Sequence, residues 1–364
     1  MKKLSYWFWL SMLVACTSDT NEDTDTDTVE DTDSGDGTIW PGERWGEATP
    51  EEYGMDSTAL EALKEYAFRA AHNTQAVLVI KDGVLLAEWY SDNRDETSLV
   101  TSWSMGKSVA SSLVGIGIDD GLLSLDEAAS TWITEWADGP NNDITLRHLL
   151  EMRSGLPENN TNPYGVYGAE PDQLAYSIDR TPIREPGTQF SYVNEDSMIL
   201  GAVLDRAFGQ STAEVAQTRL FEPLGMQGDW WTDGEGNTLT YCCIDSTARD
   251  FARFGLLFAR GGEWDGQQII SESYVTESTT GVSSYGYYGL HWWVFDDNLF
   301  AAIGLHSQLL IVDREQDIVL VRFGLYDKVG TGTVREGRAY QSTAEPGPFD
   351  QETFVTLAYD AILD

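Results

Sequence analysis

The sequence is poor in basic residues, histidine and cysteine. Lys and Arg number 22 against 60 Asp and Glu, which gives the 364-residue chain a formal net charge of −38. A chain with this balance repels nucleic acid and anionic lipid, so we expect no nucleic-acid partner. Four histidines and three cysteines are poorly placed for a zinc site of the usual ligand spacing. We therefore predict no bound metal, and we expect no cofactor.

The apolar run nearest the N-terminus is too short to span a bilayer comfortably. It covers residues 6–15 and follows Lys2 and Lys3, which is the layout of a secretory signal peptide. The run ends in Leu13-Val14-Ala15-Cys16, which resembles the bacterial lipobox. Residues 1–15 are therefore predicted to be a signal peptide and Cys16 the lipid-modified N-terminus, with an ordinary signal peptide as the alternative. The expected location is a bacterial membrane, on its periplasmic or cell-surface side.

The segment that follows, residues 16–38, is rich in Asp and Thr and has no apolar residue before Val29. Such a segment cannot bury enough surface to offset the entropy of ordering it, so we predict a disordered acidic linker. The other two cysteines, Cys242 and Cys243, are adjacent and have no further Cys or His at ligand spacing. We expect them to be structural, as buried thiols or as a vicinal disulfide.

Residues 39–364 are predicted to form one domain of the α+β class. Strand patterns occur near both ends of this region, and helical patterns fill the middle. This order predicts an antiparallel sheet built from both ends and flanked by helices, beside a mostly helical lobe at roughly 125–260, with a site in the cleft between them. The expected strands are 76–80, 84–90, 289–295, 299–303, 308–312 and 318–323, and the expected helices are 104–120, 144–152, 197–208, 247–260 and 351–363.

The sharpest chemical signal is Ser104-Met105-Gly106-Lys107 at the start of a predicted helix. Residues three apart share a helical face, so Lys107 can reach the Ser104 hydroxyl. The free N–H groups and the positive end of the helix dipole would stabilise an oxyanion there. Taken alone, the pattern also fits a capping serine beside a solvated lysine.

A second motif, Ser191-Tyr192-Val193-Asn194, follows a Pro-Gly turn and precedes a helix. With both motifs the chain resembles the serine hydrolase family of class C β-lactamases, DD-peptidases, carboxylesterases and 6-aminohexanoate-dimer hydrolases. The resemblance runs from about Trp40 to the end, and it is nearest to the esterase and 6-aminohexanoate-dimer hydrolase branch. The longer matching segments are 144–156, 221–226 and 247–255.

The resemblance implies a β-lactamase/transpeptidase-like fold and an acyl-enzyme on Ser104, with Lys107 as its partner and Tyr192 as the general base. A phenol with a pKa near ~10 needs a neighbouring cation to act as a base at neutral pH, and Lys107 can be that cation. The alternative is that Lys107 itself is the base, as a neutral amine. Asn194 matches the substrate-side Asn of the family.

A third segment, residues 302–308, departs from the Lys-Thr-Gly of β-lactamases and resembles the Gly-x-x-Gly-Gln strand of the esterase branch. The resemblance implies that Gly304 lets substrate approach and that the Leu305 N–H joins that of Ser104 as an oxyanion donor. Ala302 stands where the lysine would hold a substrate carboxylate, so β-lactams become doubtful substrates. Further substrate contacts are expected from His306 and Trp293, and an apolar acyl pocket from Trp292, Trp293, Phe295 and Leu305.

The sequence thus predicts a serine hydrolase that acts on small esters or amides. A β-lactamase or DD-peptidase, or a catalytically silent cell-wall binding module on the same fold, remain the alternatives. Of the remaining histidines, His148 is expected to be a structural hydrogen-bonding residue. His291 is expected either to line the pocket or to lie in the core.

Overall fold

The computed structural model describes residues 32–33, 37–92, 94–157, 166, 171–282, 284–324 and 349–363. The predicted signal peptide and Cys16 lie outside the described residues, as does most of the acidic linker. Within the described part of the chain, no helix is both long and apolar enough to cross a lipid bilayer.

A six-stranded antiparallel sheet forms the centre of the molecule, with the strand order β10-β11-β12-β13-β3-β4. Strands from both ends of the chain meet in its middle, where β13 pairs with β3 and Val321 stands opposite Leu78. The bounds are Thr74–Lys81 (β3), Val84–Tyr90 (β4), Trp293–Val294 (β10), Leu299–Gly304 (β11), Gln308–Asp313 (β12) and Ile318–Gly324 (β13).

The hairpin between β3 and β4 turns at Asp82 and Gly83, which both have positive φ angles, 52° and 83°. This matches the two-residue hairpin turn that an Asp-Gly pair favours. The predicted strand at 289–295 is shorter in the structure and covers only β10. His291 takes a left-handed φ of 61°, which interrupts the extended run ahead of Trp293.

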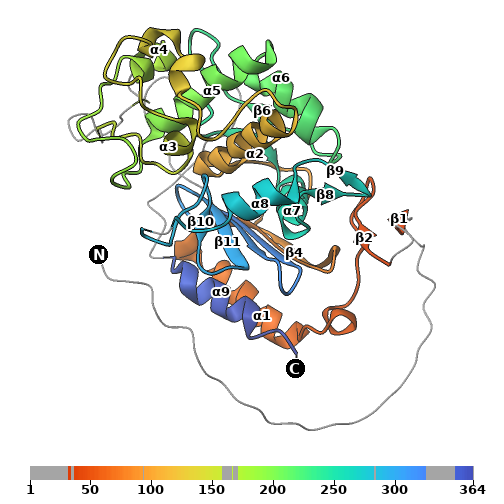
Figure 1. Ribbon diagram of the computed structural model, residues 1–364. Helices are drawn as coiled ribbons and strands as arrows, with labels where there is room; N and C mark the ends of the chain where they lie inside the picture. The colour runs from red at the N-terminus through yellow and green to blue at the C-terminus, as the bar shows by residue number, and fades with distance from the viewer. Residues whose placement is uncertain are drawn as a thin grey trace, which may run out of the picture.

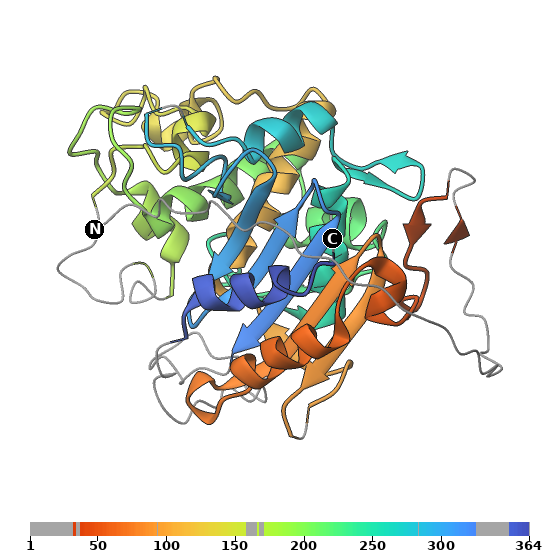
Figure 2. The ribbon, with the colours of Figure 1, turned by 90° about the horizontal axis from the view of Figure 1, so that it is seen from below.

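Helices cover both faces of the sheet. Helices α1 and α9 lie side by side across one face, where Leu63 and Phe354 pack on Val79 and Leu320 in one core (Figures 1 and 2). Helix α7 packs on the other face, within a second, larger core to which α2 also contributes. The bounds are Ser57–Ala67 (α1), Gly106–Asp119 (α2), Ala248–Ala259 (α7), Glu272–Ser278 (α8) and Gln351–Tyr359 (α9).

The smaller lobe is mostly helical and lies beyond α2, as Figure 1 shows. Helix α2 stands between the sheet and this lobe, and almost all of its residues are buried. The lobe contains Leu146–Leu150 (α3), Gln173–Ile178 (α4), Asn194–Phe208 (α5), Thr212–Ala216 (α6) and the π-helical turn Gln217–Phe221 (η7). The α+β fold class predicted from the sequence is confirmed.

The remaining elements are short. A three-stranded sheet has the order β5-β7-β6 and lies beside the start of α2, and two further strand pairs are β1-β2 and β8-β9. The strand bounds are Thr32–Asp33 (β1), Ile39–Trp40 (β2), Leu99–Thr101 (β5), Asp229–Trp230 (β6), Ile244–Thr247 (β7), Glu263–Trp264 (β8) and Gln267–Gln268 (β9). The 3-10 helices are Pro50–Tyr53 (η1), Ala70–His72 (η2), Trp103–Met105 (η3), Ala129–Thr131 (η4) and Thr134–Trp136 (η5).

Candidate active site

Ser104 lies on a sharp bend between β5 and α2. It is the middle residue of η3, and Trp103 before it takes a left-handed φ of 48°, which is unfavourable for a residue with a side chain. Strand β7 holds the bend in place. Ser102 N–H donates to Ile244 O at 2.9 Å, and Ile244 N–H donates to Ser102 Oγ at 2.9 Å. The predicted helix at 104–120 therefore starts as one tight turn at Ser104 before α2 begins.

Lys107 is 1% exposed, and its Nζ has three oxygen neighbours. Ser104 Oγ lies 3.2 Å away, Asn194 Oδ1 2.7 Å and Tyr241 O 2.7 Å. Burial lowers the pKa of Lys107 to about 7, and the nearby Glu195 carboxylate opposes this in part. A neutral amine is therefore accessible to Lys107 near neutral pH.

The geometry around Nζ determines what a neutral Lys107 can do. A neutral amine has two N–H groups and one lone pair, whereas an ammonium has donors only. The Asn194 and Tyr241 oxygens can only accept hydrogen bonds, so they occupy both N–H groups of the amine. The lone pair is then left for the third neighbour, the Ser104 hydroxyl.

Tyr192 lies in the loop before α5, beside the same serine. Burial raises the pKa of its phenol to about 12, and a hydrogen bond with the Ser104 side chain lowers it by less. The phenol therefore keeps its proton at neutral pH. The ring stacks on Trp293 with centroids 5.8 Å apart, and Lys107 Nζ lies 5.0 Å from the ring centroid.

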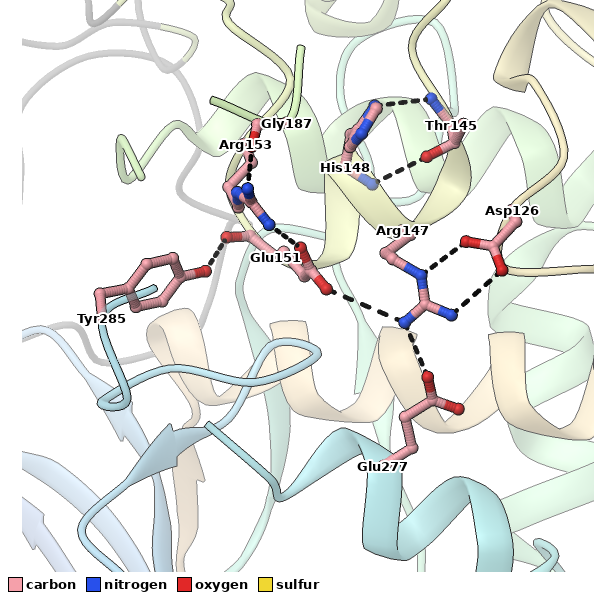
Figure 3. A network of polar contacts seen from close by, with 9 residues as sticks. All are labelled: Asp126, Thr145, Arg147, His148, Glu151, Arg153, Gly187, Glu277 and Tyr285. Carbon is pink, nitrogen blue, oxygen red and sulfur yellow. Dashed lines mark hydrogen bonds and ion pairs between the residues drawn. The ribbon is translucent and has the colours of Figure 1, made fainter. Parts of the chain in front are cut away.

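The loop that carries Tyr192 is bound to the segment after α3. Gly187 N–H donates to Arg153 O at 2.8 Å, and Ser191 N–H donates to Met152 O at 2.9 Å. Figure 3 shows the Arg153 side chain between the Gly187 carbonyl and the Glu151 carboxylate. The position of Tyr192 therefore depends on the segment around residues 151–153.

Arg147 links that segment to the rest of the molecule. Its guanidinium binds Asp126 at 2.6 Å and Glu277 of α8 at 2.7 Å (Figure 3). The neighbouring His148 caps α3, because its Nδ1 accepts from Thr145 N–H at 3.3 Å. The structure gives His148 a structural role, in line with the expectation from the sequence.

Gly304 ends β11 directly against the segment that carries Ser104. A Cβ at this position would collide with Ser102 O and lie 3.0 Å from the Trp103 Cβ, so only glycine fits. The two predicted oxyanion donors, the N–H groups of Ser104 and Leu305, therefore belong to adjoining segments. Ala302 lies on the same strand and is 1% exposed.

A buried arginine, Arg322, holds the turn that follows Gly304. His306 and Ser307 both have left-handed backbones, with φ angles of 62° and 58°. Arg322 is 0% exposed and donates from Nη1 to both of their carbonyl oxygens, at 2.8 and 2.9 Å. The His306 ring packs edge-on against Trp103, with centroids 6.2 Å apart. His306 therefore lies beside the segment that carries Ser104.

The predicted acyl pocket needs a correction. Trp292 is 0% exposed and packs on Phe258 with centroids 4.4 Å apart, so it belongs to the core and cannot line a pocket. Phe295 and Leu305 are each 50% exposed. Of the four residues, Trp293 is the one stacked on the Tyr192 ring. The alternation of the strand fails here because of the left-handed residue before Trp292.

His291 lies in the core, which decides between its two expected positions. It is 2% exposed, and its Nε2 lies 2.9 Å from Ser197 Oγ. Burial, together with a smaller effect of the Lys107 charge, lowers the pKa of His291 to about 3, so the ring is neutral.

Sequence reasoning missed two features of this site. Tyr241 acts through its backbone carbonyl, which no side-chain motif reveals. Glu195 is 3% exposed beside Lys107, and burial raises the pKa of its carboxyl. Its signal was the acidic pair Glu195-Asp196 directly after Asn194.

Cys242 and Cys243 form a vicinal disulfide, which decides between the two forms expected of them. In the part of the chain that the structure describes, no group of three His, Cys, Asp or Glu residues is placed to hold a metal ion.

Comparison with known proteins gives consistent results. A family model described as Beta-lactamase matches residues 61–324. A 6-aminohexanoate-dimer hydrolase from Paenarthrobacter ureafaciens is 23% identical, over 68% of this chain and 72% of the relative. The crystal structure of a family VIII carboxylesterase matches with a TM-score of 0.63 at 16% identity, over 85% of this chain and 99% of that chain. A D-stereospecific amidohydrolase from Streptomyces sp. matches with a TM-score of 0.57 at 18% identity, over 72% of this chain and 94% of that chain.

Proposed function

The chain belongs to the Beta-lactamase family, and we propose that it is a serine hydrolase that forms an acyl-enzyme on Ser104 and acts on small esters or amides in preference to β-lactams. The observation that carries this proposal is the buried Lys107 amine, whose two fixed acceptors, Asn194 Oδ1 and Tyr241 O, leave its lone pair for Ser104 Oγ. In this proposal Ser104 keeps its predicted role as the nucleophile. Lys107, rather than Tyr192, is the principal base.

In acylation, Ser104 Oγ attacks the carbonyl carbon of the substrate and its proton passes to Lys107 Nζ. The N–H groups of Ser104 and Leu305 stabilise the oxyanion of the tetrahedral intermediate. Tyr192 then gives its phenolic proton to the leaving oxygen or nitrogen as the bond to the acyl carbon breaks. The new Lys107 ammonium stabilises the phenolate and returns the proton to it. Water repeats the sequence on the acyl-enzyme.

The substrate class follows from the residue at position 302. β-Lactams of the penicillin and cephalosporin type carry a carboxylate, and the lysine that would hold it is replaced by the buried Ala302. The strongly acidic chain also disfavours an anionic ligand. Trp293, stacked on Tyr192, offers an apolar surface to an uncharged acyl or leaving group. The names of two of the relatives, a 6-aminohexanoate-dimer hydrolase and a family VIII carboxylesterase, agree with this choice.

The test compares kcat/KM for p-nitrophenyl butyrate and for the cephalosporin nitrocefin, together with labelling by a fluorophosphonate. A lost charge-assisted contact costs about 1.5–3 kcal/mol, so we expect the ester to be preferred over nitrocefin by about one to two decades. Ser104→Ala should abolish turnover and labelling, whereas Ser108→Ala, one turn further along α2, should keep labelling. Better turnover of nitrocefin would refute the substrate class, and activity retained by Ser104→Ala would refute the nucleophile.

We also propose that the protein is exported and attached to a bacterial membrane through a lipid on Cys16. The basic start, the apolar run of residues 6–15 and the lipobox-like ending support this, and a disulfide in the body is typical of an oxidising compartment. Cys16→Ser should move the protein from the membrane fraction to the soluble fraction, whereas Ser18→Ala should not. A membrane fraction unchanged in Cys16→Ser would contradict the lipid anchor.

A further inference from the structure

The vicinal disulfide lies directly behind the nucleophile. Cys242 and Cys243 are 0% and 1% exposed, and the bond between their sulfurs closes a small ring around a single peptide unit. Cys243 takes a left-handed φ of 71°, a conformation unfavourable for a residue with a side chain. The ring restricts the backbone at this point, so it helps to keep Cys243 in that conformation.

The disulfide lies in the segment formed by residues 241–243. Each of these three residues contacts the part of the chain that carries Ser104 and Lys107. The Tyr241 carbonyl accepts from Lys107 Nζ at 2.7 Å, and Cys243 N–H donates to Trp103 O at 3.3 Å. Cys242 packs against the helix start, because a Cβ on Gly106 would lie 2.9 Å from Cys242 O. The disulfide ring is therefore one residue from the carbonyl that orients Lys107.

The segment is also anchored on its other side. The Trp230 indole N–H donates to Cys242 O at 2.8 Å, and Trp231 N–H donates to Cys243 O at 3.0 Å. The ring thus lies between Trp230 and Trp231 on one side and the segment that carries Ser104 on the other. A change in its backbone would be transmitted to the Tyr241 carbonyl.

A role in global stability does not explain this disulfide. A cross-link stabilises a fold mainly by shortening loops of the unfolded chain, and its effect grows with loop length. A bond between adjacent residues closes the smallest loop available, so it restricts the unfolded chain very little. Its effect must lie in the local conformation of the folded chain.

We propose that the Cys242–Cys243 disulfide is a positioning element of the active site, which holds the Tyr241 carbonyl against the Lys107 amine so that the amine lone pair points at Ser104. This proposal rests on the proposed function, in which Lys107 takes the serine proton. It makes catalysis sensitive to thiol reductants. A dithiol such as dithiothreitol transfers two electrons and two protons to the pair, which gives two thiols and the cyclic disulfide of the reagent.

The direction of the pH effect follows from the groups around Lys107. They are Ser104 on η3, Tyr192 in the loop before α5, Glu195 on α5 and His291 before β10. Tyr241, beside the disulfide, completes the set, and its ring centroid lies 5.7 Å from Nζ. Burial is the main cause of the low pKa of Lys107, so a loosened segment that admits water raises this pKa. Reduction should therefore shift the acid limb of the kcat profile to higher pH.

The experiment uses the full chain in three forms: oxidised, reduced with dithiothreitol, and the variant Cys242→Ala/Cys243→Gly. Glycine at position 243 accepts the left-handed backbone, so this variant removes the cross-link without a steric penalty. Mass spectrometry after alkylation verifies that both cysteines are reduced. Esterase kcat, KM and the pH profile are measured with p-nitrophenyl butyrate, and thermal unfolding is followed in parallel.

We expect the reduced protein and the variant to lose roughly tenfold in kcat at neutral pH, a part of the general-base contribution, with KM and the unfolding temperature little changed. Dithiothreitol should not affect the variant, which serves as the control for side effects of the reagent. If the buried disulfide resists reduction, the variant alone decides. An unchanged kcat and pH profile in the variant or in the verified reduced protein would overturn the proposal. Failure of the proposed function is distinguishable, because oxidised protein would then not be labelled at Ser104 by a fluorophosphonate.

Discussion

Replacing Asn194 with Asp would test whether Lys107 is the base. The change keeps the size of the side chain and puts a carboxylate where Oδ1 now lies 2.7 Å from Lys107 Nζ. Two unit charges about 4 Å apart interact by about 4 kcal/mol at an effective dielectric constant of about 20. This corresponds to about three pKa units of Lys107, and the cost of burying the new carboxylate reduces the net increase to about two.

The sign of the effect follows from the form of Lys107 that reacts. Only the neutral amine accepts the Ser104 proton, so kcat of the unmodified enzyme should rise with pH through about 7. In Asn194→Asp the same limb should lie about two units higher. The loss in kcat is then about a hundredfold near pH 6 and almost nothing near pH 10. Asn194→Ala is the matched control, because it removes the acceptor without adding a charge and should leave the limb near its original pH.

The assay is the initial rate of p-nitrophenyl butyrate hydrolysis at saturating substrate between pH 5 and 10. Two results would refute the reasoning. One is an acid limb that does not move in Asn194→Asp. The other is a limb well above pH 9 in the unmodified enzyme, which would point to the Tyr192 phenolate, because burial raises the pKa of that phenol to about 12.

Three further predictions concern single side chains. Tyr192→Phe keeps the stacking on Trp293 but removes the proposed proton donor to the leaving group, so kcat should fall by about 10²–10⁴ while the unfolding temperature stays the same. A loss below tenfold would count against that role. Gly304→Ala should reduce kcat strongly because a Cβ collides with Ser102 O, whereas Gly139→Ala, whose nearest neighbour lies at 3.9 Å, should be neutral; equal activity of the two variants would contradict the predicted close contact. Asp196 is 0% exposed and burial raises its pKa, so the folded chain holds a proton that the unfolded chain has lost, and the free energy of unfolding falls as pH rises through the folded pKa. Asp196→Asn should flatten this dependence in denaturant titrations between pH 5 and 8, and an unaltered slope would show that Asp196 does not cause it.

The fold was largely predictable because its signals are local. The alternation of β3 and β4, the Asp82-Gly83 turn and the apolar runs of β11, β12 and β13 are each readable from a few residues. The same applies to Ser104 and Lys107, since a spacing of three on a helix fixes their proximity. That one antiparallel sheet is built from both ends of the region followed from the strand patterns near those ends, whereas the order of its strands did not.

What could not be predicted depends on backbone conformations and on contacts between distant segments. The left-handed backbone of His291 turns Trp292 into the core, and the conformational preferences of histidine do not predict this backbone conformation. The Tyr241 carbonyl reaches Lys107 across 134 positions of sequence, through an atom that every residue has. The pKa values that favour Lys107 over Tyr192 as the base result from burial, which exists only in the assembled fold.

The pairing of β3 with β13 has a consequence for the order in which the protein folds. Residues 74–81 pair with residues 318–324, so the central strand pair cannot form until nearly the whole chain is available. Ser104 and Lys107 are synthesised early, but the turn held by Arg322, which carries the proposed second oxyanion donor, is completed only when β13 docks. Pairing across such a long loop is slow, because the entropy of closing it is lost before the contacts compensate. Catalytic competence should therefore be among the last properties to appear during refolding, and a chain truncated before residue 318 should be inactive even though it contains Ser104, Lys107 and Tyr192.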